Sequence, residues 1–217
     1  MTDSALACLM TVDAVLLPPP DIDQKCISVS NQLARYGTEF TLSEGGFYPH
    51  LSLYMADVDD ADIGLAEQRL IEIAKDTAPV PLTAQRHLQD TEHGMIEVAY
   101  ANTQPVTRLQ ERLLAALAPL RRRLRRRDPV GRDLPAWLPT TTGETRRNLE
   151  RYGYDEIGGL FRPHITFTRF VQRDLVIDAA ELPPPGEFDA SFSRLGLFEM
   201  GDHGTCTRSL VELELTG

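Results

Sequence analysis

Apolar and polar residues alternate in two similar segments, FYPHLSLY at residues 47–54 and FRPHITFT at residues 161–168. Successive side chains of a β-strand point to opposite faces, so residues two apart share a face. We therefore predict two strands that pack on one side and present an imidazole beside a hydroxyl on the other. The presented pairs are His50 with Ser52 and His164 with Thr166.

Other segments follow the helical period. Apolar residues recur at intervals of three and four within residues 62–76 and 106–120, which predicts two amphipathic helices. Alternation returns in two pairs of segments separated by short turns, at residues 80–89 and 94–100 and at residues 188–200 and 209–215. Such pairs are typical of antiparallel strands, so the predicted class is α+β with antiparallel sheets.

The sequence also contains an internal repeat. NQLARYG at residues 31–37 is matched by RNLERYG at residues 147–153, an offset of 116, and the two Pro-His segments follow at an offset of 114. A looser match relates His93 to His203 at an offset of 110. Because the matches occur in one order, they indicate a duplicated unit. Glycine suits the left-handed position after a helix, so each R-Y-G is expected to end one.

The repeat predicts the domain organisation. We expect one bilobal domain over residues 1–217, with pseudo-symmetric lobes of about residues 1–104 and 105–217. Each lobe would contain an antiparallel sheet with flanking helices, and the two would enclose a central cleft. The pattern also allows strands to be exchanged between the lobes.

Composition limits the classes of function. The formal net charge of −10 argues against a long contact with nucleic acid, which needs clustered cations over a broad face. The sequence lacks a run of roughly 18 to 20 apolar residues and a typical signal peptide, so we expect a cytoplasmic protein without a membrane partner. Three widely spaced cysteines suggest neither a disulfide framework nor a zinc site. A monomer is the default oligomeric state.

One basic segment departs from this acidic balance. RRRLRRRDPVGR, at residues 121–132, contains seven arginines and one aspartate, so it has a net charge of +6 and the rest of the chain −16. It is interpreted either as a solvated helix end that leads into a loop or as a strip that guides an anionic substrate.

If the lobes pack symmetrically, the two histidines face each other across the cleft. One neutral imidazole can accept a proton and the other, protonated, can donate one, because the unperturbed pKa of histidine is about 6.5. The two hydroxyls can donate hydrogen bonds to phosphoryl oxygens. A metal is disfavoured because neither histidine has another ligand at suitable spacing, and a serine nucleophile because the G-x-S-x-G turn is missing. No cofactor is expected.

Four further residues are candidates for substrate binding. Tyr48 and Tyr54 extend the presented face of the first segment, and Arg162 shares the face of His164. Arg169 closes the second segment and could help to neutralise a phosphate. The His-Gly pairs at His93 and His203 are interpreted as tight turns with a structural role.

The motifs HLSL and HITF, separated by 114 residues, resemble those of the 2H phosphoesterase superfamily, which includes LigT-like cyclic phosphodiesterases and 2′-5′ RNA ligases. The resemblance implies a bilobal α+β fold and metal-independent action on 2′,3′-cyclic or related phosphodiesters. It implies catalysis by both histidines, with the adjacent hydroxyls holding the phosphate. The residues that match these roles are His50, Ser52, His164 and Thr166.

The leading hypothesis is hydrolysis of a cyclic (2′,3′-type) or 2′-linked phosphodiester in a nucleotide or RNA end. Two alternatives remain open. One is a module that binds a nucleotide or RNA end without turnover, and the other is a 2′-5′ RNA ligase that runs the same chemistry in reverse.

Overall fold

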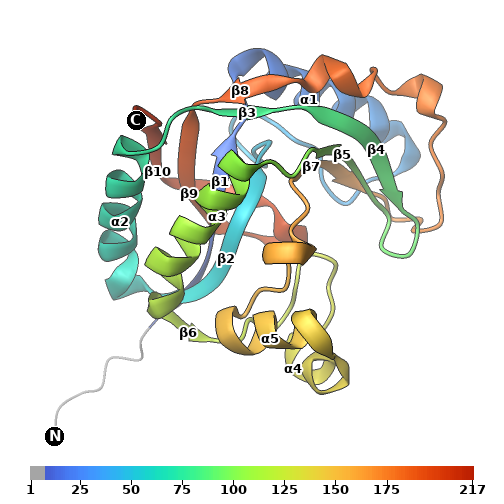
Figure 1. Ribbon diagram of the computed structural model, residues 1–217. Coiled ribbons are helices and arrows are strands. Elements are labelled where there is room, and N and C mark those ends of the chain that lie inside the picture. Colours follow the sequence, from blue (N-terminus) through green and yellow to red (C-terminus); the bar gives the residue numbers. More distant parts are fainter. Residues whose placement is uncertain (1–7) are drawn as a thin grey trace, which may run out of the picture.

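The computed structural model describes residues 8–217, which form an α+β structure with antiparallel sheets (Figure 1). The five-stranded sheet has the order β10-β9-β1-β2-β6 and consists of β1 (Leu9–Leu17), β2 (Leu51–Asp59), β6 (Arg121–Arg123), β9 (Arg194–Met200) and β10 (Cys206–Glu214). The three-stranded sheet consists of β4 (Ala84–Asp90), β5 (Met95–Tyr100) and β7 (His164–Arg169). The short strands β3 (Val80–Leu82) and β8 (Ala190–Phe192) form a separate pair.

Helices cover both larger sheets. The α-helices are α1 (Pro20–Leu33), α2 (Ile63–Lys75), α3 (Gln104–Leu117), α4 (Leu134–Trp137) and α5 (Gly143–Tyr152). Short 3-10 helices are η1 (Ala34–Tyr36), η2 (Asp60–Asp62), η3 (Ala118–Leu120), η4 (Leu138–Thr140), η5 (Gly158–Leu160), η6 (Ala179–Glu181), η7 (Pro185–Phe188) and η8 (Asp202–Gly204). Helices α2 and α3 pack together on the five-stranded sheet, and α1 packs on β7 (Figure 1). Within residues 8–217 no helix is both long and apolar enough to cross a membrane.

Strands from both halves of the sequence meet in each larger sheet. β1 and β2 come before residue 105 and pair with β9 and β6 from the second half, whereas β7 joins β4 and β5 from the first half. Each larger sheet therefore combines strands from both sides of residue 105, the boundary expected between the two sequence repeats. The strand orders β9-β1-β2 and β4-β5-β7 correspond to each other and preserve the pseudo-symmetry.

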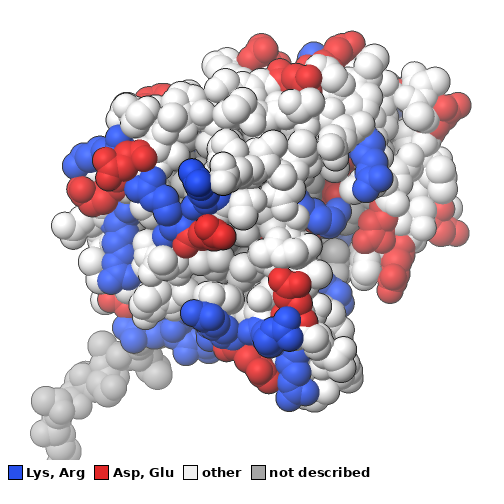
Figure 2. Space-filling model, in the orientation of Figure 1, with Lys and Arg blue, Asp and Glu red and all other residues white. Residues whose placement is uncertain are grey.

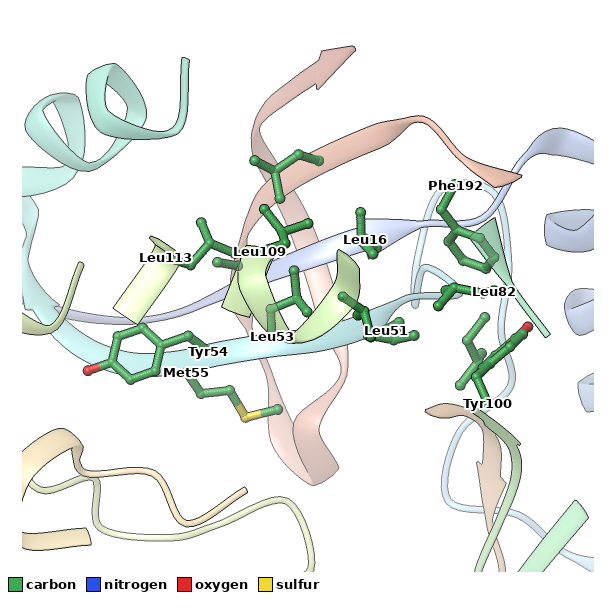
Figure 3. Close-up of a cluster of buried hydrophobic side chains, with 14 of the residues drawn as sticks. Leu16, Leu51, Leu53, Tyr54, Met55, Leu82, Tyr100, Leu109, Leu113 and Phe192 are labelled. Carbon is green, nitrogen blue, oxygen red and sulfur yellow. The ribbon is translucent and has the colours of Figure 1, made fainter. Parts of the chain in front are cut away.

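The main hydrophobic cluster extends through both larger sheets, and one part of it lies between the five-stranded sheet and α3 (Figure 3). Leu51 and Leu53 of β2 are fully buried and pack near Leu109 and Leu113 of α3, as the alternation and the helical period predicted. Burying a leucine side chain stabilises a fold by roughly 1.5–3 kcal/mol. This packing holds the opposite face of β2 in place at the cleft.

Each Pro-His strand contains a β-bulge just after its His-x-Ser/Thr sequence. In β2 the partners of Ser52 and Tyr54 are adjacent residues of β1, so Leu53 is the extra residue. In β7 the partners of Thr166 and Thr168 are adjacent residues of β5, so Phe167 is extra. A bulge changes which face the following side chains occupy. The duplication therefore includes the bulge, which strict alternation could not predict.

The repeated R-Y-G sequence ends a helix in both halves, as predicted. Gly37 follows η1 with φ 78°, and Gly153 follows α5 with φ 69° in the left-handed region. At Gly153 an added Cβ would also lie 2.8 Å from Cδ of Arg121. Glycine is suited to both the positive φ and the close contact.

Candidate functional site

The four strongest sequence candidates line one cavity of about 320 Å³ between the two larger sheets. His50 directly precedes β2, which carries Ser52, and β7 carries both His164 and Thr166. The histidine side chains are 12% and 20% exposed, respectively, so they are accessible to a small ligand but largely desolvated. The structure therefore brings together both pairs that the sequence repeat predicted to converge.

Both imidazoles are oriented by the same local hydrogen bond. Nδ1 of His50 lies 2.7 Å from the Tyr48 carbonyl oxygen, and Nδ1 of His164 lies 2.6 Å from the Arg162 carbonyl oxygen. Because a carbonyl oxygen only accepts, Nδ1 is the donor in each ring. Nε2 is then the nitrogen that gains or loses a proton in the cavity.

The two histidines have opposite pKa shifts. Burial lowers the pKa of His50, and the positive charge of His164 lowers it further against the hydrogen bond to Tyr48. Burial also lowers the pKa of His164, but the carboxylates of Glu97 and Glu156 more than offset this, so its pKa is raised. Oε2 of Glu97 lies 3.5 Å from Nε2 of His164. Near neutral pH, His50 is therefore suited to accept a proton and His164 to donate one.

The two hydroxyls differ in their partners. Ser52 Oγ donates a hydrogen bond to Oδ2 of Asp13 at 2.6 Å. Thr166 lines the cavity, and its hydroxyl has no hydrogen-bond partner among residues 8–217. Thr166 is thus free to donate to a ligand, whereas Ser52 shares its hydrogen with a carboxyl group.

Asp13 is a site residue that the sequence reasoning did not identify. Its side chain is fully buried, and its Oδ1 has no partner within the described chain. Burial raises the pKa of Asp13 to about 7, against the opposing hydrogen bond from Ser52 and the charges of Arg125 and His164. The available signal was a lone acidic residue within the apolar run LMTVDAVLL of β1.

Arg162 lies at the cavity, as predicted, but its charge is shared with two acids that the sequence reasoning also missed. Its Nη1 donates to Oε1 of Glu97 at 2.7 Å, and its Nη2 is 3.4 Å from Oε1 of Glu156. These ion pairs hold both carboxylates beside His164. Arg162 can therefore act on a ligand directly or through the carboxylates that tune the histidine.

Tyr48 lies at the cavity, where the sequence placed it, whereas Tyr54 does not lie on that face. Tyr48 lines the cavity, and its ring centroid lies 5.2 Å from that of Phe198. Tyr54 is only 1% exposed and donates from its hydroxyl to the Tyr152 carbonyl at 2.9 Å (Figure 3). The bulge at Leu53 turns Tyr54 into the core, away from the face that carries Ser52.

Arg169 does not line this cavity, contrary to the expectation that it helps to neutralise the phosphate there; its side chain is 7% exposed and lines a second, adjoining cavity. It donates to the carbonyl oxygens of His93 and Val130 and to Nδ1 of His203. Arg169 thus joins the two predicted His-Gly turns. His203 lies in such a turn with φ 60°, and it also lines the cavity, with Nε2 2.9 Å from a Glu39 oxygen.

Three side chains could hold a metal ion. Ligand atoms of Asp13, His50 and Cys206 all lie within 4.8 Å of one another. Carboxylate, imidazole and thiolate ligands suit zinc. However, burial raises the pKa of the Cys206 thiol well above its ordinary value, and Asp13 already accepts a hydrogen bond from Ser52. A metal would therefore have to displace a proton and compete with this bond. These three residues lie far apart along the chain, so spacing in the sequence does not reveal the cluster.

Comparison with protein-family models gives no match. No curated protein matches the sequence either. Solved structures do match. E. coli LigT complexed with NADP+ has a TM-score of 0.56 at 16% identity, covering 97% of this chain and 100% of that one. The protein TT0787 of Thermus thermophilus has a TM-score of 0.58 at 15% identity, covering 96% and 99%. A structure described as a phosphoesterase has a TM-score of 0.53 at 14% identity, also covering 96% and 99%. The similarity thus extends over nearly the whole of each chain.

Proposed function

Because the chain has the LigT-like fold of the 2H phosphoesterases, we propose that it is a metal-independent phosphodiesterase. Its substrate would be a cyclic (2′,3′-type) or 2′-linked phosphodiester of a nucleotide or RNA end. The observation that carries this proposal is the pair of histidines with opposite pKa shifts in one cavity. E. coli LigT has also been solved with 3′-AMP and with ATP, which supports a nucleotide as the substrate class here.

In the proposed reaction His50 is the base and His164 the acid. Nε2 of His50 removes a proton from water as the water oxygen forms a bond to phosphorus. The bond from phosphorus to one ribose oxygen breaks, and Nε2–H of His164 protonates that leaving oxygen. The products are a ribose hydroxyl and a phosphomonoester. Proton exchange with solvent then returns both imidazoles to their initial states.

The hydroxyls would stabilise the charge that develops on the phosphoryl oxygens. Thr166 can donate directly, because its hydroxyl has no partner among the described residues. Ser52 can do so when Asp13 is protonated, since the carboxyl O–H then donates to Ser52 Oγ and releases the serine hydrogen. The Asp13 pKa of about 7 places both forms within reach near neutral pH.

The proposal is tested with His50→Ala and His164→Ala and a substrate panel. The panel contains 2′,3′-cyclic nucleotides, 3′,5′-cyclic nucleotides, and 2′-5′ and 3′-5′ oligonucleotides. Loss of a general acid or base should lower kcat by about 10²–10⁴-fold in each variant. Product analysis that separates 2′- from 3′-monophosphates reports which ribose oxygen leaves.

The matched control is His93→Ala, which removes a histidine from the turn between β4 and β5, outside the cavity. It should retain wild-type turnover, and wild-type activity should survive EDTA. Near-normal turnover of either cavity variant would contradict the paired acid and base. Loss of activity in EDTA with recovery in Zn²⁺ would instead indicate a metal at Asp13, His50 and Cys206. Thermal stabilisation by a nucleotide without product would favour the binding module.

A further inference from the structure

A second cavity, of about 710 Å³, adjoins the first and is rich in arginine. Six arginines line it: Arg123, Arg125, Arg126, Arg127, Arg169 and Arg173. Three aspartates also line it: Asp57, Asp128 and Asp202. Four of these arginines come from the basic segment at residues 121–132. We call this cavity the arginine pocket. Basic side chains also form a band over β6 and α5 on one face of the molecule (Figure 2).

Arg125 is the most unusual member of the arginine pocket. It is 2% exposed, and its Nε and Nη2 have no hydrogen-bond partner among residues 8–217. Nη1 lies 3.8 Å from the sulfur of Met200, and the guanidinium lies 5.8 Å from the Tyr154 ring centroid. Within the described chain it has no carboxylate at ion-pair distance. Burying a charge without a direct partner is unfavourable. The Arg125 guanidinium therefore lowers the stability of the fold.

Two exposed arginines add to this positive charge. Arg126 and Arg127 make no ion pair with any residue of 8–217. The other members are engaged, since Arg123 pairs with Asp57, and Arg169 and Arg173 both contact Glu39. Asp128 is engaged by Arg132 from outside the arginine pocket. Asp202 is the remaining acid, so the uncompensated charge of the pocket is positive.

The two cavities share a wall, because five residues line both: Asp128, Pro129, Val130, His203 and Gly204. The two cavities are therefore adjacent, and a ligand bound at the histidines would lie next to the arginine pocket. Guanidinium groups are well matched to phosphate oxygens. The net charge of −16 on the rest of the chain disfavours a long nucleic acid, so the arginine pocket suits one or a few phosphoryl groups.

We propose that the arginine pocket binds a second phosphoryl group of the substrate. The substrate class is then a nucleotide or short oligonucleotide with a phosphate in addition to the one that reacts. This inference rests on the proposed phosphodiesterase function for the identity of the reacting group. The binding of a phosphate in the arginine pocket can be tested without turnover.

The kinetic test compares adenosine 2′,3′-cyclic phosphate with the same compound carrying a 5′-phosphate. The wild-type protein should prefer the 5′-phosphorylated compound in kcat/KM. In the double variant Arg126→Ala/Arg127→Ala, the ratio of the two kcat/KM values should fall by at least roughly 10- to 100-fold, the loss expected when even one charge-assisted hydrogen bond to the phosphate is removed. An unchanged ratio overturns the proposal.

The matched control is Arg146→Ala/Arg147→Ala, which removes two exposed arginines of α5 that line neither cavity. It changes the net charge equally but should leave the ratio at its wild-type value. A fall of the same size in both double variants would assign the effect to overall charge and would also overturn the proposal.

The turnover-independent test is calorimetric titration with pyrophosphate of the double variant His50→Ala/His164→Ala. Pyrophosphate should bind, and adding Arg126→Ala and Arg127→Ala should weaken binding by at least tenfold. Equal affinity for pyrophosphate with and without Arg126 and Arg127 would overturn the proposal that the arginine pocket binds phosphate. This holds whatever substrate the protein hydrolyses. Absence of turnover in the wild type together with arginine-dependent binding would overturn only the phosphodiesterase proposal.

Arg125→Met provides an independent arm. Replacing the buried guanidinium by an apolar side chain of similar length should raise the Tm and weaken pyrophosphate binding together. A lower Tm with unchanged pyrophosphate affinity would assign Arg125 a purely structural role.

Discussion

At the residue scale, the two histidines are equivalent in sequence but not in charge environment. Both donate Nδ1–H to a carbonyl oxygen two residues earlier, so their orientation follows from the repeated local structure. Only His164 faces two glutamates, whereas the carboxyl beside His50 is Asp13, whose raised pKa favours the neutral acid. The proposed assignment of base and acid therefore depends on residues outside the repeated motif.

Substituting Glu97→Gln should make this difference visible in the pH profile. Removing the carboxylate lowers the pKa of His164, so His164 loses its proton at lower pH. The alkaline limb of the kcat profile therefore shifts to lower pH. We expect activity above neutral pH to fall severalfold while the acidic limb, which reports His50, stays in place.

The control for this profile is Glu111→Gln, which changes an exposed glutamate of α3 that does not line the cavity. A wild-type alkaline limb in Glu97→Gln would contradict the assignment of His164 as the acid.

At the scale of elements, the bulges in β2 and β7 determine which side chains reach the cavity. Each bulge follows the His-x-Ser/Thr sequence, so the first two polar residues face the cavity and the next aligned residue enters the core. Tyr54 and Thr168 occupy equivalent positions, and each donates a hydrogen bond to a backbone carbonyl, of Tyr152 and Phe40 respectively. These bonds connect each strand to a segment from the other half of the chain.

Tyr54→Phe tests the structural role of this position. Loss of the hydroxyl leaves the Tyr152 carbonyl without its partner, so the free energy of unfolding should fall by about 1–3 kcal/mol. Urea unfolding measures this change. Because Tyr54 does not line the cavity, kcat/KM of the folded variant should match that of the wild type. A large loss of kcat/KM at wild-type stability would return Tyr54 to the substrate site.

At the scale of the whole molecule, the buried carboxyl of Asp13 links the cleft to folding stability. The folded protein retains the Asp13 proton up to about pH 7, whereas the unfolded chain releases it near the ordinary value of 3.8. The native state therefore binds more protons between these values, and the free energy of unfolding falls as the pH rises through them.

Asp13→Asn should remove this contribution. Between pH 4 and pH 8 the wild type should lose roughly 2–4 kcal/mol more unfolding free energy than the variant. The reason is that a pKa shift of three units corresponds to about 4 kcal/mol. Urea unfolding at a series of pH values measures it. Asp174→Asn, at an exposed aspartate, should show no such trend. Parallel curves for wild type and Asp13→Asn would refute the raised pKa.

Local pattern was sufficient for much of the fold. The period of two predicted β2 and β7, the helical period predicted α2 and α3, and the glycines of R-Y-G marked helix ends. The sequence predicted less well which strands pair with each other. Residues 80–89 were expected to form one strand, but β3 separates from β4 and pairs with β8, because backbone partners distant in sequence decide where a strand ends.

The sequence by itself determined the class of the fold and the two His-x-Ser/Thr pairs, since alternation, helical period and duplication are properties of neighbouring residues and repeated spacing. Tertiary structure alone decided which strands the lobes exchange, which face Tyr54 occupies and which acids stand beside each histidine. Asp13 and Glu97 lie far along the chain from their histidines, and only folding brings them within 4 Å. The pKa of a group depends on such spatial neighbours, so the opposite pKa shifts on which the proposed base and acid rest follow from the tertiary structure and not from the repeated motif.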